Sequence, residues 1–250
     1  MTASKGSGDV VRTLIANEPS LPDDNPHAFG GLQRLCRAAV RVLPAWGVGV
    51  NVMSDGGEPT TVASSGAVSA EIQELQFTLG EGPCLDAFAL RRPVLTPDLA
   101  LEARSRWLDY APAAGDRGVR AVFAFPLQMG AARLGVMDVY RDEVGPLSPE
   151  SLTQAFSFAD AAMDCLLDAA PGPGEDPGSG EDSGAPGLDD ALESHYELYQ
   201  AQGMVMIQLK VGLDEAMSRL RAYAYAYERR LGDVAGDIVS RRMTFETEES

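Results

Sequence analysis

The stretch from Ala169 to Gly187, AAPGPGEDPGSGEDSGAPG, constrains the fold of this chain more than any other sequence feature. It contains only Pro, Gly, Ser, Ala and acidic residues, and no apolar periodicity runs through it. Such a segment buries too little apolar surface to offset the entropy of ordering, so it predicts a flexible linker between two folded parts. The expected organisation is a disordered N-terminus over 1–24, a first domain over 25–170, the linker over 171–188, a second domain over 189–245 and a tail over 246–250.

Composition excludes several classes of protein. No run approaches the roughly 18 to 20 apolar residues that span a bilayer, and the N-terminus lacks the apolar segment of a secretory signal, so we expect a cytoplasmic protein. Three cysteines stand far apart without a CxxC motif, and the chain has only two histidines. These counts argue against a disulfide framework, a metal site and histidine-based catalysis. No set of catalytic residues is visible, and we expect a protein that is not an enzyme.

Charge is distributed unevenly along the chain. The formal net charge is −17, which argues against broad electrostatic binding of a nucleic acid. Between Gly203 and Phe245, however, seven basic side chains stand among five acidic ones. This window leaves room for one local basic face.

The first region alternates helix-like and strand-like patterns. Strand, DGG turn and strand follow one another near residues 47–65, and two apolar strands flank a Met-Gly turn near 120–141. Ser148 and Pro149 form a typical helix start. That helix is expected to bury Leu152, Phe156, Ala159, Met163, Leu166 and Leu167. The pattern predicts an α+β domain with an antiparallel sheet and flanking helices.

The second region contains three short amphipathic patterns. They predict an all-α three-helix bundle, whose size makes it marginally stable alone. The first helix is expected to present Leu192, Tyr196, Tyr199, Gly203 and Met206 on one face. The expected core positions of the second helix are Ala216, Met217, Leu220, Ala224 and Tyr227, and those of the third are Leu231, Val234, Ala235, Ile238 and Val239.

Specific residues in both regions resemble known families. In the tail, QAQGMVMIQL, LDEAMSRLRAYA and LGDVAGDIV resemble the ANTAR family of RNA-binding antitermination domains. The matching features are Ala201, Gly203, Glu215–Ala216, Leu220–Ala222, Leu231 and Val234–Ala235. In the first region, LGEGPCLDAF (79–88) and FPLQMGAARLGVMDVY resemble a GAF domain. The two resemblances imply a regulator that binds paired hairpins in nascent leader RNA and prevents a terminator from forming, as a homodimer because two hairpins imply two copies.

RNA binding needs cations for phosphates and planar groups for exposed bases. The candidate RNA-binding residues are Lys210, Arg221, Tyr223, Arg229, Arg230, Arg241 and Arg242. The alternative is a solvated helix face, with Arg241 and Arg242 complementing a helix C-terminus. The resemblance to ANTAR domains favours the RNA-binding interpretation.

A sensed signal is harder to identify from the sequence. GEGPCLDA (80–87) lacks the GxxxxGK[ST] pattern of an ATP-binding loop, so a tight turn before a helix is the favoured interpretation. The candidate cofactor-binding residues are Cys84, Asp86 and Trp107, with the cofactor itself unknown. Cys84 is either a redox-sensitive thiol near a helix N-terminus or a small buried apolar residue. The alternative function is a small-molecule or redox sensing module whose tail dimerises or docks on a protein partner.

Overall fold

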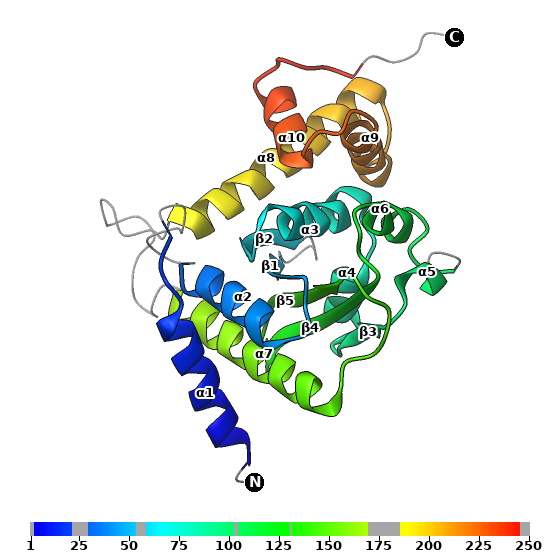
Figure 1. Ribbon diagram of the computed structural model, residues 1–250. Coiled ribbons are helices and arrows are strands. Elements are labelled where there is room, and N and C mark those ends of the chain that lie inside the picture. Colours follow the sequence, from blue (N-terminus) through cyan, green and yellow to red (C-terminus); the bar gives the residue numbers. More distant parts are fainter. Residues whose placement is uncertain are drawn as a thin grey trace, which may run out of the picture.

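A computed structural model describes residues 3–21, 30–53, 59–102, 105–130, 132–169 and 186–245. Figure 1 shows a sheet-containing domain with three further helices at one end. Within the described parts of the chain, no helix has the length and apolar character needed to cross a membrane. Most of the linker expected over 171–188 lies outside the described residues, although its last three positions belong to a helix that begins at Pro186.

The first domain is built on one five-stranded antiparallel sheet. Its strands are β1 (Gly47–Met53), β2 (Pro59–Ser64), β3 (Val94–Thr96), β4 (Ala121–Met129) and β5 (Ala132–Arg141), in the order β2-β1-β5-β4-β3. The two expected hairpins are β1–β2 and β4–β5, while β1 also pairs with β5. The predicted α+β fold is therefore confirmed.

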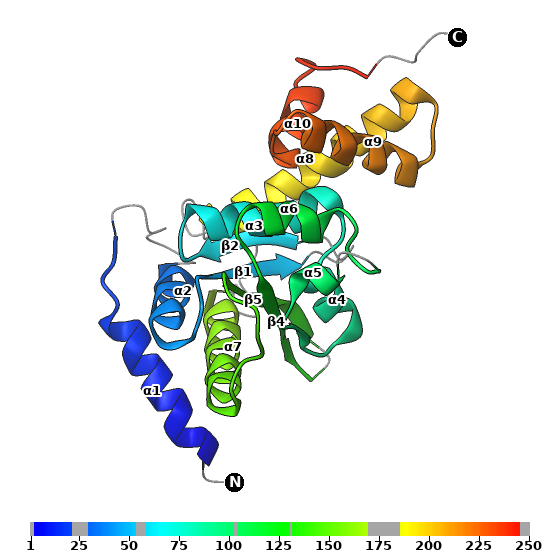
Figure 2. The ribbon, with the colours of Figure 1, turned by 45° about the vertical axis from the view of Figure 1, so that its right-hand side comes forward.

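Helices cover both faces of the sheet, as Figure 2 shows. On one face, α2 (Gly30–Val42) and α7 (Pro149–Ala169) enclose a core with Leu35, Phe123 and Phe158. The other face carries α3 (Ala67–Leu79), α4 (Pro83–Leu90), α5 (Leu99–Glu102) and α6 (Tyr110–Asp116). A second core, with Trp107 and Tyr110, lies beneath these helices.

The expected disorder of residues 1–24 is wrong for much of that segment. Ala3–Asn17 form helix α1, in which Val11 is buried and Leu14 and Ile15 pack against the same core as α2 and α7. Val11, Leu14 and Ile15 have the i, i+3, i+4 spacing of an apolar helix face. Because the first residues of the chain are mostly polar, this short apolar pattern was not recognised as a helix from the sequence.

The long helix α7 begins as expected, and its buried face matches the predicted one in part: Ala159, Met163 and Leu166 are buried. The Ser148 hydroxyl accepts a hydrogen bond from the Ser151 backbone N–H at 3.1 Å, which confirms the N-cap. Phe158 is fully buried, whereas Phe156 is 43% exposed and Leu167 is 37% exposed. Packing on the sheet therefore buries a face of α7 that includes Phe158, a residue that sequence periodicity placed next to the predicted apolar face.

The tail folds as the predicted three helices: α8 (Pro186–Leu209), α9 (Leu213–Ala226) and α10 (Leu231–Val239). The expected core positions of α9 are buried except Tyr227, which follows the end of the helix and is 63% exposed. Those of α10 are buried except the partly buried Val239. The expected face of α8 is only partly correct where its side chains are described, because Met206 packs against the core of the tail as a partly buried side chain but Tyr199 does not. Leu198, Ala201 and Val205 are buried, while Tyr199 is 43% exposed.

The two domains contact each other directly. Helix α9 lies over α3, and α8 passes beside β2, an arrangement visible in Figure 1. Phe77 of α3 packs against the core of the tail, which otherwise consists of residues of α8, α9, α10 and the segment that follows. One side chain of the first domain thus completes the apolar core of the second.

Candidate functional site

Asp237 of α10 holds two of the predicted arginines. Arg229 donates a hydrogen bond from Nη2 to Oδ2 of Asp237 at 2.6 Å, and Arg242 donates from Nε to Oδ1 at 2.7 Å. These hydrogen bonds lower the pKa of Asp237. The turn before α10 and the segment after it therefore present their guanidinium groups together, although thirteen positions separate them in the sequence.

An aromatic cluster accompanies this arginine pair. The rings of Tyr223 and Tyr227 lie 4.3 Å apart and 31° from parallel, and Phe245 meets Tyr223 edge-on at 5.5 Å. Tyr227 is 63% exposed, so one ring of the cluster is open to solvent. Exposed aromatic rings stack on unpaired bases, and guanidinium groups bind phosphates. We refer to Tyr223, Tyr227, Arg229 and Arg242 as the aromatic-arginine surface.

The remaining candidates lie in other surroundings. Arg221 is half-buried against Gly80 of the first domain, where an added Cβ would lie 2.5 Å from Nη1 of Arg221. Arg230 is exposed and lines the cleft between the domains. Lys210 and Arg241 are exposed in the turns that follow α8 and α10, both at positive φ. The fold therefore brings together Tyr223, Arg229 and Arg242 but directs Arg221 and Arg230 toward α3.

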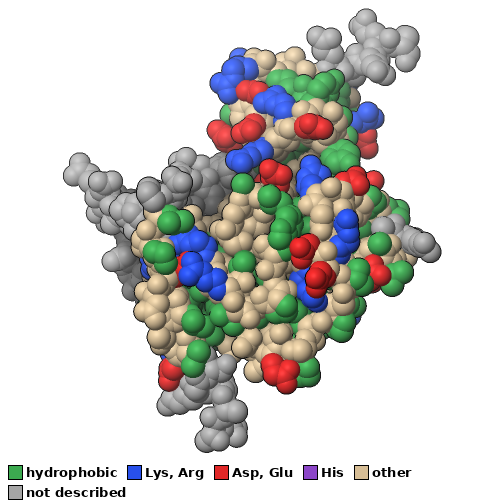
Figure 3. Space-filling model, viewed as in Figure 1, with side chains coloured by type: hydrophobic (Ala, Val, Ile, Leu, Met, Phe, Trp, Pro, Cys, Tyr) green, Lys and Arg blue, Asp and Glu red, His purple; other side chains and the backbone are tan. Residues whose placement is uncertain are grey.

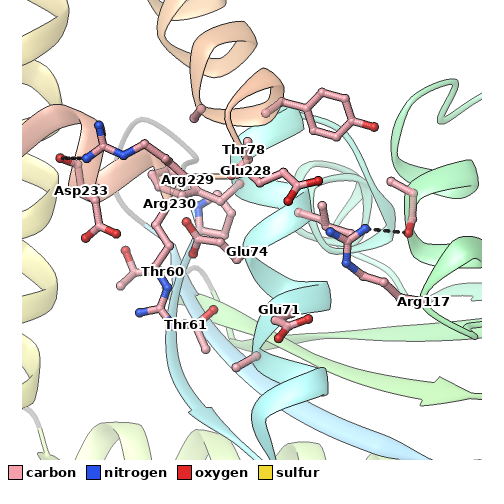
Figure 4. Close-up of a pocket in the computed structure, with 18 of the residues that line it drawn as sticks. Thr60, Thr61, Glu71, Glu74, Thr78, Arg117, Glu228, Arg229, Arg230 and Asp233 are labelled. Atoms are coloured by element: carbon pink, nitrogen blue, oxygen red, sulfur yellow. Dashed lines mark hydrogen bonds between the residues drawn. The ribbon is translucent and has the colours of Figure 1, made fainter.

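An open cleft of about 1200 Å³ lies between the two domains. Residues of β2, α3 and α6 line one side, and the turn between α9 and α10 lines the other. Figure 4 shows Arg230 extending across it toward Thr60 and Thr61, with Glu74 near the start of α10. In Figure 3, basic and acidic side chains stand side by side at this boundary. The cleft is of mixed charge, which distinguishes it from a simple basic groove.

The interior of the first domain contains a buried polar cluster around Asp138 of β5. Oδ2 of Asp138 accepts hydrogen bonds from Asn51 Nδ2 at 3.2 Å, Gln76 Nε2 at 3.0 Å and the Tyr140 hydroxyl at 3.2 Å. Burial raises the pKa of Asp138 to about 7, against the opposing effect of these donors. Oδ1 of Asp138 and the Tyr110 hydroxyl are buried without a hydrogen-bond partner. Polar groups of this kind favour a bound polar molecule or water.

The three cofactor candidates divide between two settings. Cys84 belongs to the buried cluster, where Asn51 Nδ2 lies 3.5 Å from its sulfur, and burial raises the pKa of its thiol well above the usual value. A thiol in that state is a poor nucleophile, which favours the buried-apolar interpretation over a redox sensor. Asp86 and Trp107 form a separate pair, in which Trp107 Nε1 donates to Asp86 at 3.1 Å. Arg106 also binds Asp86 at 2.8 Å.

Sequence reasoning missed several residues of these sites. Asp237 and Phe245 join the aromatic-arginine surface, while Asn51, Gln76 and Asp138 form the buried cluster. The i, i+4 spacing of Tyr223 and Tyr227 was a usable signal for their pairing. No local signal identifies the buried cluster, because its members come from β1, α3 and β5. Among the described residues, no group of His, Cys, Asp and Glu has the arrangement of a metal site.

Comparisons with solved structures support the fold of the first domain. The GAF domain of phosphoenolpyruvate-protein phosphotransferase from Acinetobacter matches with a TM-score of 0.51 and 9% identity, covering 68% of this chain and 96% of that chain. The corresponding domain from Coxiella burnetii has a TM-score of 0.51 and 16% identity, with 67% and 96% covered. A comparison with curated proteins returned no match.

Family models match both parts of the chain. The GAF domain model matches residues 32–166, and the ANTAR domain model matches residues 187–239. A GAF domain ahead of an ANTAR domain supports a regulator with an RNA-binding output under sensory control. The chain belongs to the GAF domain family, and behind its GAF domain it carries a region that matches the ANTAR domain.

Proposed function

We propose that this protein is a transcription antitermination regulator that binds paired hairpins in nascent leader RNA through its C-terminal helices. The observation that carries the proposal is the aromatic-arginine surface, in which the stacked pair of Tyr223 and Tyr227 lies near Arg229, and Asp237 joins Arg229 to Arg242. The cations contact phosphates and the ring stacks on a loop base. Because each copy has one such surface, paired hairpins call for a homodimer.

The GAF domain supplies the control in this proposal. Its buried cluster holds the unpaired polar atoms of Asp138 and Tyr110, which suit a small polar ligand inside the domain. In this proposal Asp138 and Cys84 contact that ligand from the buried cluster, whereas Asp86 and Trp107 form a separate pair and are weaker candidates. The proposed site of action is the cytoplasm, where nascent leader RNA is made.

Binding of a two-hairpin leader RNA by the full chain over a salt series tests the output. Arg241→Ala/Arg242→Ala is expected to weaken binding about tenfold or more and to reduce the salt slope by roughly 0.7 to 0.9 for each phosphate that is no longer neutralised. Arg229→Ala/Arg230→Ala is expected to weaken binding as well. Arg219→Ala serves as the control, because Arg219 lies exposed on α9 outside the aromatic-arginine surface. If the unchanged protein, the two double variants and Arg219→Ala all bound the RNA with the same affinity and the same salt dependence, the proposed function would be rejected.

A second candidate function rests on exposed apolar side chains of the tail. Ile207 is 72% exposed and Leu213 is 54% exposed. Such positions suit a tail that dimerises or docks on a protein partner, with the first domain as a small-molecule or redox sensing module. In that case the arginine variants would leave association unchanged, whereas Ile207→Asp would abolish it.

A further inference from the structure

Asp237 lies in the last turn of α10, where a negative charge is unfavourable. The carbonyl groups at the C-terminal end of a helix carry a partial negative charge, which repels a carboxylate. The same carboxylate lies between two arginines of the surface that we propose for RNA, where it also repels phosphates. Neither helix stability nor net charge explains an aspartate at this position, so its hydrogen bonds indicate its role.

Both oxygens of this carboxylate bind arginines of the aromatic-arginine surface. Oδ2 accepts from Nη2 of Arg229 at 2.6 Å, and Oδ1 accepts from Nε of Arg242 at 2.7 Å. Arg229 precedes α10 and Arg242 follows it, so one side chain holds a cation at each end of the helix. The Asp237 side chain is only 23% exposed, which limits the screening of both ion pairs by salt.

The bonds to Asp237 leave each arginine with donors for a second partner. A guanidinium group has several N–H donors in a fixed planar arrangement. Arg242 donates to Asp237 through Nε, which leaves its two terminal nitrogens for a phosphate, and its side chain is 68% exposed. A guanidinium that is held at one edge can bind a phosphate with its remaining nitrogens. An RNA phosphate can therefore bind Arg242 without displacing Asp237.

Arginines that are ordered before binding lose less entropy when RNA arrives. A mobile arginine side chain loses rotamer freedom when a phosphate fixes it, and Asp237 already restricts Arg229 and Arg242. We propose that Asp237 is a positioning residue of the RNA-binding surface, whose carboxylate holds both arginines in place for phosphates, so that loss of this negative charge weakens the binding of a polyanion. This inference rests on the proposed RNA-binding function.

The first test compares Asp237→Asn with Asp233→Asn in the full chain. Asp233 lies exposed one turn earlier on α10, so both variants remove one negative charge from the same helix. The backbone carbonyl of Asp237, which accepts from the N–H groups of Arg242 and Met243, is retained in Asp237→Asn.

The two variants are expected to differ in their affinity for the two-hairpin leader RNA. Asp237→Asn should bind about fivefold more weakly than the unchanged protein, because both arginines regain their freedom. Asp233→Asn should stay within about twofold. Removal of charge alone predicts tighter binding by both. Circular dichroism shows whether Asp237→Asn is folded, and equal or tighter binding by the folded variant would overturn the proposal.

The second test repeats Asp237→Asn in the Arg229→Ala/Arg242→Ala background, at low salt so that weak binding stays measurable. Asp237 then has neither arginine to hold and acts only through its own charge. In this background Asp237→Asn is expected to leave the affinity unchanged or to raise it. A merely structural role of Asp237 would weaken binding in both backgrounds, and the same loss in both would reject the proposal.

Arg242→Lys tests the same geometry without altering Asp237, and it provides the test if Asp237→Asn does not fold. Lysine keeps the charge but lacks the planar fork that binds a carboxylate and a phosphate at different edges. Binding about threefold weaker is expected, and unchanged affinity would contradict the proposal.

The two proposals fail in different ways. Absence of RNA binding by the unchanged protein would reject the proposed function itself. RNA binding that neither Asp237→Asn nor Arg242→Lys alters would reject only the positioning role of Asp237.

Discussion

Two aspartates of this chain have opposite surroundings, one in each domain. Asp138 is buried in the GAF domain among neutral donors, and burial raises its pKa to about 7. Asp237 lies near the surface of the tail between two arginines, whose hydrogen bonds lower its pKa. Burial without a counter-ion disfavours the charged form, whereas hydrogen bonds from cations favour it. The GAF domain therefore contains a titratable carboxyl group, Asp138, in its interior, whereas the carboxylate of Asp237 in the tail is paired with arginines near the surface.

The comparison shows how one chain separates sensing from output. A buried polar cluster responds to small changes in its partners, because each unmet hydrogen bond in a low-dielectric interior is costly. Exposed ion pairs contribute little to stability and are free to exchange partners with a charged ligand. The interior of the GAF domain is suited to detect a signal, and the surface of the tail is suited to bind a polyanion.

The largest expected effect concerns Asp138. The folded-state pKa is about 7 and the reference value is 3.8. Between these values the folded protein holds a proton that the unfolded chain has lost. Asp138 therefore makes the free energy of unfolding decrease as pH rises from about 4 to about 7, by a few kcal/mol, with no further change above that range.

The Asp138→Asn variant should remove this dependence. Cys84, Tyr110 and Tyr140 face Asp138 and stay protonated across the range, because burial raises the pKa of each. Denaturant unfolding, followed by the fluorescence of the buried Trp107, measures the difference at several pH values. The exposed Asp142→Asn serves as the control. Parallel pH profiles for the unchanged protein and Asp138→Asn would contradict the role of burial.

An intermediate effect is expected at Tyr227. Tyr227→Ala removes the exposed ring and should weaken RNA binding by about 1 to 3 kcal/mol, the range for one stacked base. Tyr227→Phe keeps the ring on Tyr223 and should bind as the unchanged protein does. Fluorescence anisotropy of labelled RNA measures both. If Tyr227→Ala also binds normally, the tail surface acts through charge alone.

The smallest effect is expected for the ion pair between Arg219 and Glu215. The side chains of Arg219 and Glu215 are 60% and 49% exposed, respectively, and lie one turn apart on α9. The distance from Nε of Arg219 to Oε1 of Glu215 is 2.8 Å. An exposed pair of this spacing contributes about 0.5 kcal/mol or less, so Arg219→Ala should barely change the free energy of unfolding. Thermal unfolding at low and high salt measures the change. A decrease well above 1 kcal/mol would mean that surface pairs in the tail are structural.

Local sequence patterns predicted the positions of helices and strands better than they predicted which face of each helix is buried. The three tail helices and both hairpins follow from apolar spacing and turn residues, which act within a few positions. The inward faces of α7 and α8 were predicted correctly only in part, because both helices carry apolar residues around more than one side. Phe158 and Leu198 are buried only because a sheet and two short helices approach from those directions. Tertiary packing overrides periodicity when apolar stripes compete.

The sequence by itself determined two domains, an antiparallel sheet, a three-helix tail and a basic window in that tail. Each of these depends on composition or on spacing over short distances. Tertiary structure alone decided that Asn51, Gln76 and Asp138 meet in one cluster and that Asp237 joins Arg229 to Arg242. These contacts join distant positions, and hydrogen bonds between distant residues leave no periodic trace along a chain. Here the buried group and the surface charge differ in pKa because of where the fold places them.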